Sequence, residues 1–254
     1  MRFSKWHALG NSYLVVERDE AGELGPERVR RLCDGDTGIG SDGVLEVVQR
    51  SGAHAEIVIW NPDGSVAEMS GNGTRIAARW LALDTGSDEV TIVTAGRETV
   101  ATMLAGLDTS MDVGEVTVGI PEALDTGERV ELVTAFVGNP HAVIRMDAPT
   151  REDLLRLGPM VETHERFPAR TNVQLVGVAG PHDIEVLVWE RGAGETRSSG
   201  SSSVAAAAVA VARGWCESPV TVHLPGGALV VALAGDRATL TGPAELICTG
   251  ETSL

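Results

Sequence analysis

Short stretches in which apolar and polar residues alternate recur along the chain, each bounded by Gly, Pro, Asp or Asn. Alternation with a period of two is typical of a strand that buries one face. The pattern predicts strands at 13–17, 55–60, 90–94, 115–120, 183–189 and 228–233. Helical signals are fewer and predict helices over 26–33, 72–83, 150–160 and 202–213. Many strands and one prominent helix in each half indicate an α+β fold.

The last of these helices contains the longest apolar stretch of the chain. Residues 204–212 are all Ala or Val, without a Lys or Glu. A helix that is apolar on nearly all sides is buried, and small side chains let a sheet approach it closely. We therefore expect a curled mixed sheet around a central helix.

A set of motifs occurs once in each half of the chain. Residues 9–16 and 137–144 each place Gly-Asn before an apolar run, and 70–75 and 199–203 each begin with a serine that precedes an apolar helix. The spacing between the two motifs is nearly the same in both halves. Further matched segments are 38–48 with 168–178, 58–64 with 187–193, and 90–97 with 220–227. We interpret the sequence as one α/β unit that has been duplicated and fused.

This repeat predicts two pseudo-symmetric domains. No linker stands out in the composition, so we place the boundary near 119–121. The expected domains are an N-terminal repeat domain at 1–118 and a C-terminal repeat domain at 119–254. The last residues, about 246–254, are expected to pack back on the first domain.

Composition excludes several classes of partner. The net charge of −16 opposes binding to nucleic acid or to anionic membranes. The N-terminus has no apolar leader, and the longest apolar stretch is too short to span a bilayer. The cysteines (Cys33, Cys216 and Cys248) are odd in number and widely spaced, which suggests neither a disulfide framework nor a zinc site. We expect a cytoplasmic protein without a bound metal.

The two serine motifs, at 70–73 and 198–202, lie where a Gly-rich turn leads into a helix. Unpaired N–H groups and the positive end of the helix dipole meet there, so such a site suits a carboxylate or a phosphate. For one copy alone, the simplest interpretation is an N-cap serine followed by turn glycines. Two matched copies favour a functional site.

Two nucleotide-binding motifs are not supported. Neither serine loop ends in Gly-Lys followed by Ser or Thr, as a phosphate loop would. Residues 38–43 contain a fragment of a dinucleotide fingerprint, but no βαβ unit with a downstream acid surrounds it. We interpret this segment as a turn that leads into a strand.

Seven motifs, in order and over nearly the whole chain, resemble the diaminopimelate epimerase family. They lie at 8–13, 38–43, 61–65, 67–75, 138–143, 170–174 and 189–196. The resemblance implies two pseudo-symmetric α/β domains that enclose an active site without a cofactor. It also implies that the site inverts an α-carbon of 2,6-diaminopimelate, interconverting the LL and meso isomers for lysine and cell-wall biosynthesis.

Inversion without a cofactor requires a base on one face of the carbon and an acid on the other. The resemblance implies that Ser70 and Ser199 hold these two positions, where the family has cysteines, and that His141 and Glu190 support them. A thiol has a reference pKa of about 8.5, whereas a serine hydroxyl is a far weaker acid.

Three explanations for the serines therefore remain open. The serines relay protons slowly; or the chain is an isomerase or dehydratase of another small amino or hydroxy acid, with Glu68 or Glu190 as the base; or it binds an amino acid without turnover.

The resemblance also implies a set of binding residues. The side chains expected to hold the distal amino-acid head are Asn11, Asn61, Asn139, Asn172, Glu190 and Arg191. The residues expected to present N–H or hydroxyl groups to the reacting carboxylate are Gly71, Asn72, Gly200 and Ser201. Amides donate and accept, and a Glu–Arg pair can bind an ammonium and a carboxylate together. The expected partner is a small amino-acid substrate, and a homodimer is allowed.

Overall fold

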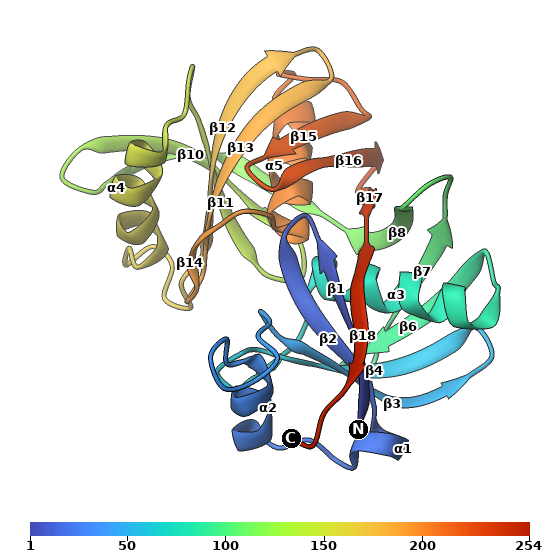
Figure 1. The fold of residues 1–254 in the computed structure, drawn as a ribbon. Helices are drawn as coiled ribbons and strands as arrows, with labels where there is room; N and C mark the ends of the chain where they lie inside the picture. The colour runs from blue at the N-terminus through green and yellow to red at the C-terminus, as the bar shows by residue number, and fades with distance from the viewer. The chain divides into compact units, whose positions relative to one another are not determined.

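The computed structural model describes residues 1–254, which divide into two compact units (Figure 1). Unit 1 comprises Met1–Met111 with Gly242–Leu254, and unit 2 comprises Asp112–Thr241. The chain leaves unit 1 within β8 (Asp108–Glu115) and returns to it within β17 (Arg237–Pro243). The segment in which we placed the boundary, 119–121, lies inside β9.

Apart from α1, the two units contain equivalent elements, although β18 comes last in unit 1 whereas its counterpart β9 comes first in unit 2. Besides its parts of β8 and β17, unit 1 contains β1 (Arg2–Ala8), β2 (Asn11–Glu17), α1 (Arg18–Ala21), α2 (Pro26–Cys33), β3 (Val44–Ser51), β4 (His54–Trp60), β5 (Val66–Ala67), α3 (Gly71–Thr85), β6 (Glu89–Thr94), β7 (Arg97–Met103) and β18 (Glu245–Glu251). Unit 2 contains β9 (Thr117–Asp125), β10 (Arg129–Phe136), β11 (Pro140–Arg145), α4 (Arg151–Glu162), β12 (Asn172–Gly180), β13 (Asp183–Glu190), β14 (Gly194–Thr196), α5 (Gly200–Ala212), β15 (Val220–Leu224) and β16 (Gly227–Ala234).

Strand pairing follows the same scheme in both units. In unit 1, β18, β1 and β2 pair antiparallel, β2 pairs parallel with β3, and β4 pairs antiparallel with β3 and parallel with β6. In unit 2, β9, β10 and β11 pair antiparallel, β11 pairs parallel with β12, and β13 pairs antiparallel with β12 and parallel with β15. Each sheet is therefore mixed, and the internal repeat predicted from the sequence is confirmed.

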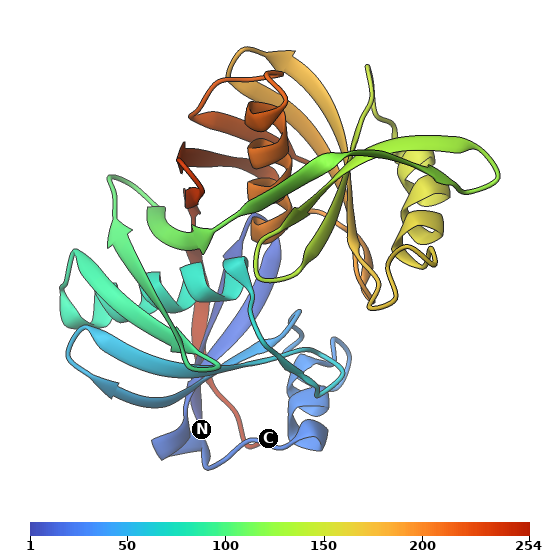
Figure 2. The same ribbon diagram turned by 180° about the vertical axis from the view of Figure 1, so that it is seen from behind.

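Each sheet curls around one helix, as predicted. Helix α3 packs against β1, β2, β4, β6 and β7, and α5 packs against strands from β9 to β16 (Figures 1 and 2). Ten of the thirteen residues of α5 are buried, and its first turn contains only glycine and serine. Because the remainder is Ala and Val, strands approach it from several sides.

The predicted helices are confirmed to within a few residues, and the strand predicted at 115–120 is interrupted at Val116. Residues 115–120 do not form a single strand, since β8 ends at Glu115 and β9 begins at Thr117. Between them, Val116 donates its backbone N–H to the Asp236 carbonyl, 2.7 Å away. The apolar alternation of the sequence continues through this break, at Val116, Val118 and Ile120, although only β8 buries every second residue and Ile120 in β9 is exposed.

Two buried carboxylates hold the tryptophans at the repeated positions 60 and 189. Trp60 Nε1 donates to Glu46 Oε2 at 2.9 Å, and Trp189 Nε1 donates to Glu162 Oε2 at 2.7 Å. Burial acts to raise the pKa of each carboxyl, but the hydrogen bonds outweigh it and both pKa values are lowered. These contacts fix the ends of β4 and β13, next to Asn61 and Glu190.

We expect Glu46→Ala to lower the free energy of unfolding by about 3 kcal/mol, because it leaves buried donors without an acceptor. The fully buried Glu46 carboxylate also accepts from Arg18 Nε at 2.8 Å and from the Leu24 N–H at 3.2 Å. Denaturant titration at pH 7 measures the loss. Glu131→Ala, which removes an exposed ion pair with Arg129, is the control and should change little.

The effect of Glu46 on stability should depend on pH. Because its folded pKa is lowered, the carboxylate stabilises the fold above its unfolded pKa, and this contribution disappears as pH falls through the folded pKa. The difference between the wild type and Glu46→Gln should therefore shrink toward acid pH. A difference that stays constant between pH 7 and pH 3 would contradict this assignment.

Candidate active site

Helices α3 and α5 begin at serines with nearly the same backbone conformation. Ser70 has φ −142° and ψ 115°, and Ser199 has φ −144° and ψ 122°. Their carbonyls accept from Thr74 N at 2.8 Å and from Ser203 N at 3.1 Å. The first N–H groups of a helix have no acceptor within the helix, and neither first turn contains an acidic residue. Each helix start is therefore suited to a carboxylate.

The two serines use their side chains differently. Ser70 Oγ accepts from Gly73 N at 3.0 Å, which caps α3, and lies 3.1 Å from Tyr13 Oη. Ser199 makes no side-chain cap on α5, although it is buried. Its hydroxyl instead interacts with the Glu190 carboxyl. Within its own unit, the Ser70 hydroxyl thus lies beside the Tyr13 hydroxyl, and the Ser199 hydroxyl lies beside the Glu190 carboxyl.

A buried arginine organises the candidate residues of unit 1. Arg75 Nη2 donates to Asn72 Oδ1 at 2.9 Å, and Asn72 Nδ2 donates to Asn11 Oδ1 at 3.2 Å. Arg75 Nε also donates to the Pro243 carbonyl at 3.2 Å. Burial lowers the pKa of Arg75 to about 10, so the guanidinium still carries its charge at neutral pH. A positive charge is therefore fixed beside the start of α3.

Asn61 is engaged in a local turn rather than in this chain of amides. Its Nδ2 donates to Ser65 Oγ at 2.9 Å, and its backbone N–H donates to the Ser65 carbonyl at 2.8 Å. Asp63 accepts from the same Ser65 hydroxyl at 2.6 Å. The role of Asn61 in binding stays a prediction.

His141 is the centre of a buried polar network in unit 2. Its Nε2 lies 2.7 Å from Asn139 Oδ1, and its Nδ1 lies 3.1 Å from Gln174 Nε2. Gln174 Nε2 also donates to Ser202 Oγ at 3.0 Å. Burial lowers the pKa of His141 to about 3, so the ring is neutral at pH 7. Both ring nitrogens have protein partners, which favours a role in positioning Asn139 over proton transfer.

Asn172 connects two neighbouring segments of unit 2. Its Nδ2 donates to the Pro140 carbonyl at 2.9 Å, and its Oδ1 accepts from the Arg191 backbone N–H at 3.0 Å. The guanidinium of Arg191 is exposed and reaches the Ala169 carbonyl at 3.3 Å. Asn172 therefore holds the turn that carries Arg191.

Glu190 lies beside Thr196 and Ser199 in an environment that raises its pKa. Burial raises the pKa of its carboxyl, and hydrogen bonding from Thr196 and Ser199 opposes this shift without cancelling it. A carboxylate with a raised pKa takes up a proton more readily than an ordinary one. Glu68, the other carboxylate considered as a base, is exposed. Of these two carboxylates, Glu190 is the one that interacts with the Ser199 hydroxyl.

Sequence reasoning missed four residues of these networks: Tyr13, Arg75, Gln174 and Thr196. Two of them carried a usable signal. Tyr13 follows Asn11 by two positions on β2, and Gln174 follows Asn172 by two positions on β12. Residues two apart on a strand share a face, so each lies beside an asparagine that the sequence had already singled out.

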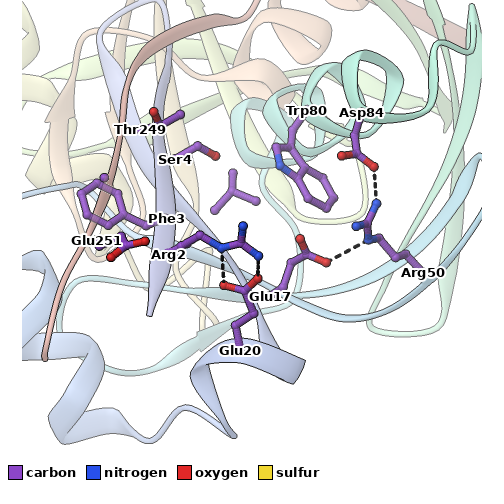
Figure 3. Close-up of a pocket in the computed structure, with 12 residues that line it drawn as sticks. Arg2, Phe3, Ser4, Glu17, Glu20, Arg50, Trp80, Asp84, Thr249 and Glu251 are labelled. Atoms are coloured by element: carbon purple, nitrogen blue, oxygen red, sulfur yellow. Dashed lines mark hydrogen bonds and ion pairs between the residues drawn. The ribbon is translucent and has the colours of Figure 1, made fainter.

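A pocket of about 460 Å³ in unit 1 contains none of the candidate residues (Figure 3). Its two arginines are already neutralised, since Arg2 pairs with Glu20, and Arg50 pairs with Glu17 and Asp84. Trp80 forms one wall, with the Arg50 guanidinium 5.6 Å from its ring centroid. This pocket offers no unpaired cation for a carboxylate.

No group of three or more His, Cys, Asp or Glu side chains is arranged to hold a metal ion. No helix combines the length and the apolar character needed to cross a bilayer.

The sequence matches the family model described as diaminopimelate epimerase twice, over residues 3–118 and 133–247. The two matches together cover most of the chain, with one match for each repeat. The chain belongs to the diaminopimelate epimerase family. Membership agrees with the resemblance drawn from the seven motifs.

Individual relatives extend this result. The chain is 39% identical to the diaminopimelate epimerase of Alkalilimnicola ehrlichii, over 100% of this chain and 99% of that protein. Among solved structures, a PhzF-family phenazine biosynthesis protein from Enterococcus faecalis has a TM-score of 0.74 at 12% identity, covering 100% of this chain and 99% of its own. A hydroxyproline epimerase from Agrobacterium vitis has a TM-score of 0.71 at 17% identity, covering 98% and 91%. These two structures share the fold.

Proposed function

We propose that the chain is a cofactor-independent epimerase that interconverts LL- and meso-2,6-diaminopimelate by two-sided proton transfer at the α-carbon. The observation that carries this proposal is the full-length match to a curated diaminopimelate epimerase. The matched serine starts of α3 and α5 support it, because a reaction that needs one proton-transfer group on each face is served by one group from each repeat.

The serines and their partners divide the chemistry. In unit 2, Glu190 is the base that acts together with the Ser199 hydroxyl, while His141 positions Asn139. In unit 1, Ser70 supplies the second hydroxyl. The N–H and hydroxyl groups at the two helix starts (Gly71, Asn72, Gly200 and Ser201) bind the reacting carboxylate. The side chains that bind the distal head are Asn11, Asn61, Asn139, Asn172 and Arg191.

A second function is favoured by one observation. The raised pKa of Glu190 also suits an isomerase or dehydratase that uses a carboxylate base and does not need Ser70. In that case Glu190→Gln would abolish turnover of a different small amino or hydroxy acid, and Ser70→Ala would not. An amino-acid-binding protein without turnover is the third outcome, and calorimetry would then detect binding of diaminopimelate without chemistry.

The test is incubation of the protein with LL-diaminopimelate in deuterated water. The expected result is meso-diaminopimelate with deuterium at the inverted α-carbon, detected by NMR and chiral chromatography. Protein that leaves the LL isomer and its α-hydrogen unchanged would contradict the proposal. Proline and glutamate serve as control substrates and should not exchange.

Two further proposals concern the setting of the enzyme. A cytoplasmic location and a homodimer stay predictions. Sedimentation equilibrium measures the oligomeric state, and cell fractionation measures the location.

A further inference from the structure

The single tyrosine of the chain lies against the serine that begins α3. Tyr13 is 6% exposed, and its Oη lies 3.1 Å from Ser70 Oγ. Tyr13 and Ser70 are separated by 57 positions in the sequence, so the fold brings the two hydroxyls together. This contact belongs entirely to unit 1.

The tyrosine ring occupies space that a side chain at position 43 would need. A Cβ added at Gly43 would lie 2.5 Å from Tyr13 Cε1 and 2.5 Å from the Trp60 carbonyl oxygen. These distances are too short for a real contact, so the Tyr13 ring can occupy this place only because residue 43 has no side chain.

The repeat gives this position a counterpart. Asn11 and Asn139 are equivalent, so Tyr13 and His141, two positions further on, are equivalent as well. His141 is linked through Gln174 to Ser202 in the first turn of α5. Tyr13 contacts the serine of α3 directly. The same strand position therefore supplies a polar group to the helix start in both units.

The Ser70 hydroxyl can form its hydrogen bond with Tyr13 in two ways, either as the acceptor or as the donor. Its Oγ already accepts from Gly73 N at 3.0 Å. If Tyr13 donates to the remaining lone pair, the serine proton is available to a substrate; if Ser70 donates to Tyr13, that lone pair is available instead. Reversal of one hydrogen bond thus changes Ser70 from a proton donor into a proton acceptor.

We propose that Tyr13 is a positioning residue that exchanges protons with Ser70, so that this hydroxyl pair replaces a single acidic group on the unit 1 side of the reaction. The proposal rests on the epimerase function proposed above. In the acid direction, Ser70 gives its proton to the α-carbanion and takes the Tyr13 proton, which leaves a phenolate. In the base direction, Ser70 takes the α-proton and passes its own to the phenolate. The protons balance in both directions.

This relay defines the protonation state of the active enzyme. Turnover requires Tyr13 and Glu190 to hold one proton between them, on the phenol when unit 2 is the base and on the carboxyl when unit 1 is the base. These two forms contain the same number of protons, so their ratio does not change with pH. Both reaction directions should therefore share one bell-shaped profile of kcat/KM. The alkaline limb of this profile belongs to the phenol of Tyr13.

The experiment compares the wild type with Tyr13→Phe, which keeps the ring against Gly43 and removes only the hydroxyl. We expect kcat/KM for diaminopimelate to fall about 100-fold and the alkaline limb to disappear. Thr85→Val is the matched control, because it removes a hydroxyl from the opposite end of α3, and it should stay within about twofold of the wild type. Thermal unfolding verifies that all three proteins fold.

A second measurement separates proton transfer from packing. Because Tyr13 is the sole tyrosine, growth on 3-fluorotyrosine changes this position alone. Fluorine makes the phenol more acidic, so the alkaline limb should move to lower pH, which a purely structural tyrosine would not cause. Normal turnover in Tyr13→Phe, or a limb that does not move with fluorination, would overturn the relay alone. A wild type without turnover would overturn the epimerase function and the relay together.

Discussion

Ser70→Ala and Ser199→Ala are each expected to lower the rate of epimerisation about 1,000-fold, and the double variant is expected to be no slower than either single variant. Removing one positioned proton-transfer group has an effect of about this size. Because inversion needs both serines, removing either one already removes the two-sided catalysis. Removing the other serine as well should then cause little further loss, so the two effects do not add. Simple addition of the two effects would instead predict a far slower double variant.

Hydrogen exchange in deuterated water distinguishes the two serines. A variant that lacks one serine can still remove and return the α-hydrogen from the other side, which exchanges the hydrogen without inversion. Ser70→Ala should therefore exchange only one of the two isomers, and Ser199→Ala only the other. Ser87→Ala removes a serine hydroxyl beyond the far end of α3 and is the control. If both single variants exchange the same isomer, the assignment of one serine to each face is wrong.

The converse substitution supports the same assignment. A thiol is a much stronger acid than a serine hydroxyl, so Ser70→Cys combined with Ser199→Cys should raise the rate and make it sensitive to iodoacetamide. Cys248 is exposed in the wild type, so this experiment is carried out in a Cys248→Ser background. The other two cysteines are buried, and burial raises the pKa of each thiol, which protects them from alkylation.

Local signals were sufficient to predict four of the five helices, and only the four-residue α1 was missed. Helix α2 starts at Pro26, and α4 starts after Thr150, whose hydroxyl and backbone exchange hydrogen bonds with Asp153 in a capping box. Such start signals occupy four or five consecutive residues, so they can be recognised in a single sequence without knowledge of tertiary contacts. The repeat then supplied the two-domain plan, since the matched motifs recur in the same order in both halves.

Strands without alternation were harder to predict. Six consecutive residues of β12, from Asn172, are buried, because the sheet covers α5 on one face and packs against α4 on the other. Such a run lacks the period of two on which strand prediction depends. The strand break at Val116 was missed for the opposite reason, because alternation continued where the backbone changed strands.

Part of the candidate site also lay beyond sequence reasoning. The contact between Tyr13 and Ser70 depends on the pairing of β2 with β3 and on the path of the chain from β5 into α3. No local pattern in either segment encodes that distance. The hydrogen bond from the Asn61 amide to Ser65 was not foreseen either, and the role of Asn61 in binding stays a prediction.

Glu190→Gln is expected to lower the rate of epimerisation about 1,000-fold and to remove the acidic limb of the pH profile. The raised pKa of Glu190 means that the carboxylate accumulates only above the ordinary range of a glutamate. In the wild type, kcat/KM should therefore fall as pH falls through this raised value. Gln keeps the size of the side chain but cannot accept a proton. Glu195→Gln, on the neighbouring β14, makes the same change at an ion pair with Arg151 and should retain activity.

Stability separates this catalytic role from a structural one. A carboxyl whose folded pKa is raised destabilises the fold wherever it is ionised, so its unfavourable contribution appears as pH rises through that range. Glu190→Gln removes this contribution and should be as stable as the wild type, or more stable, at pH 8. Denaturant titration at pH 8 and at pH 4 measures the difference, which should be larger at pH 8. If Glu190 is the base, its replacement should lower activity while stability at pH 8 stays the same or rises. A variant that loses both activity and stability at pH 8 would contradict this role.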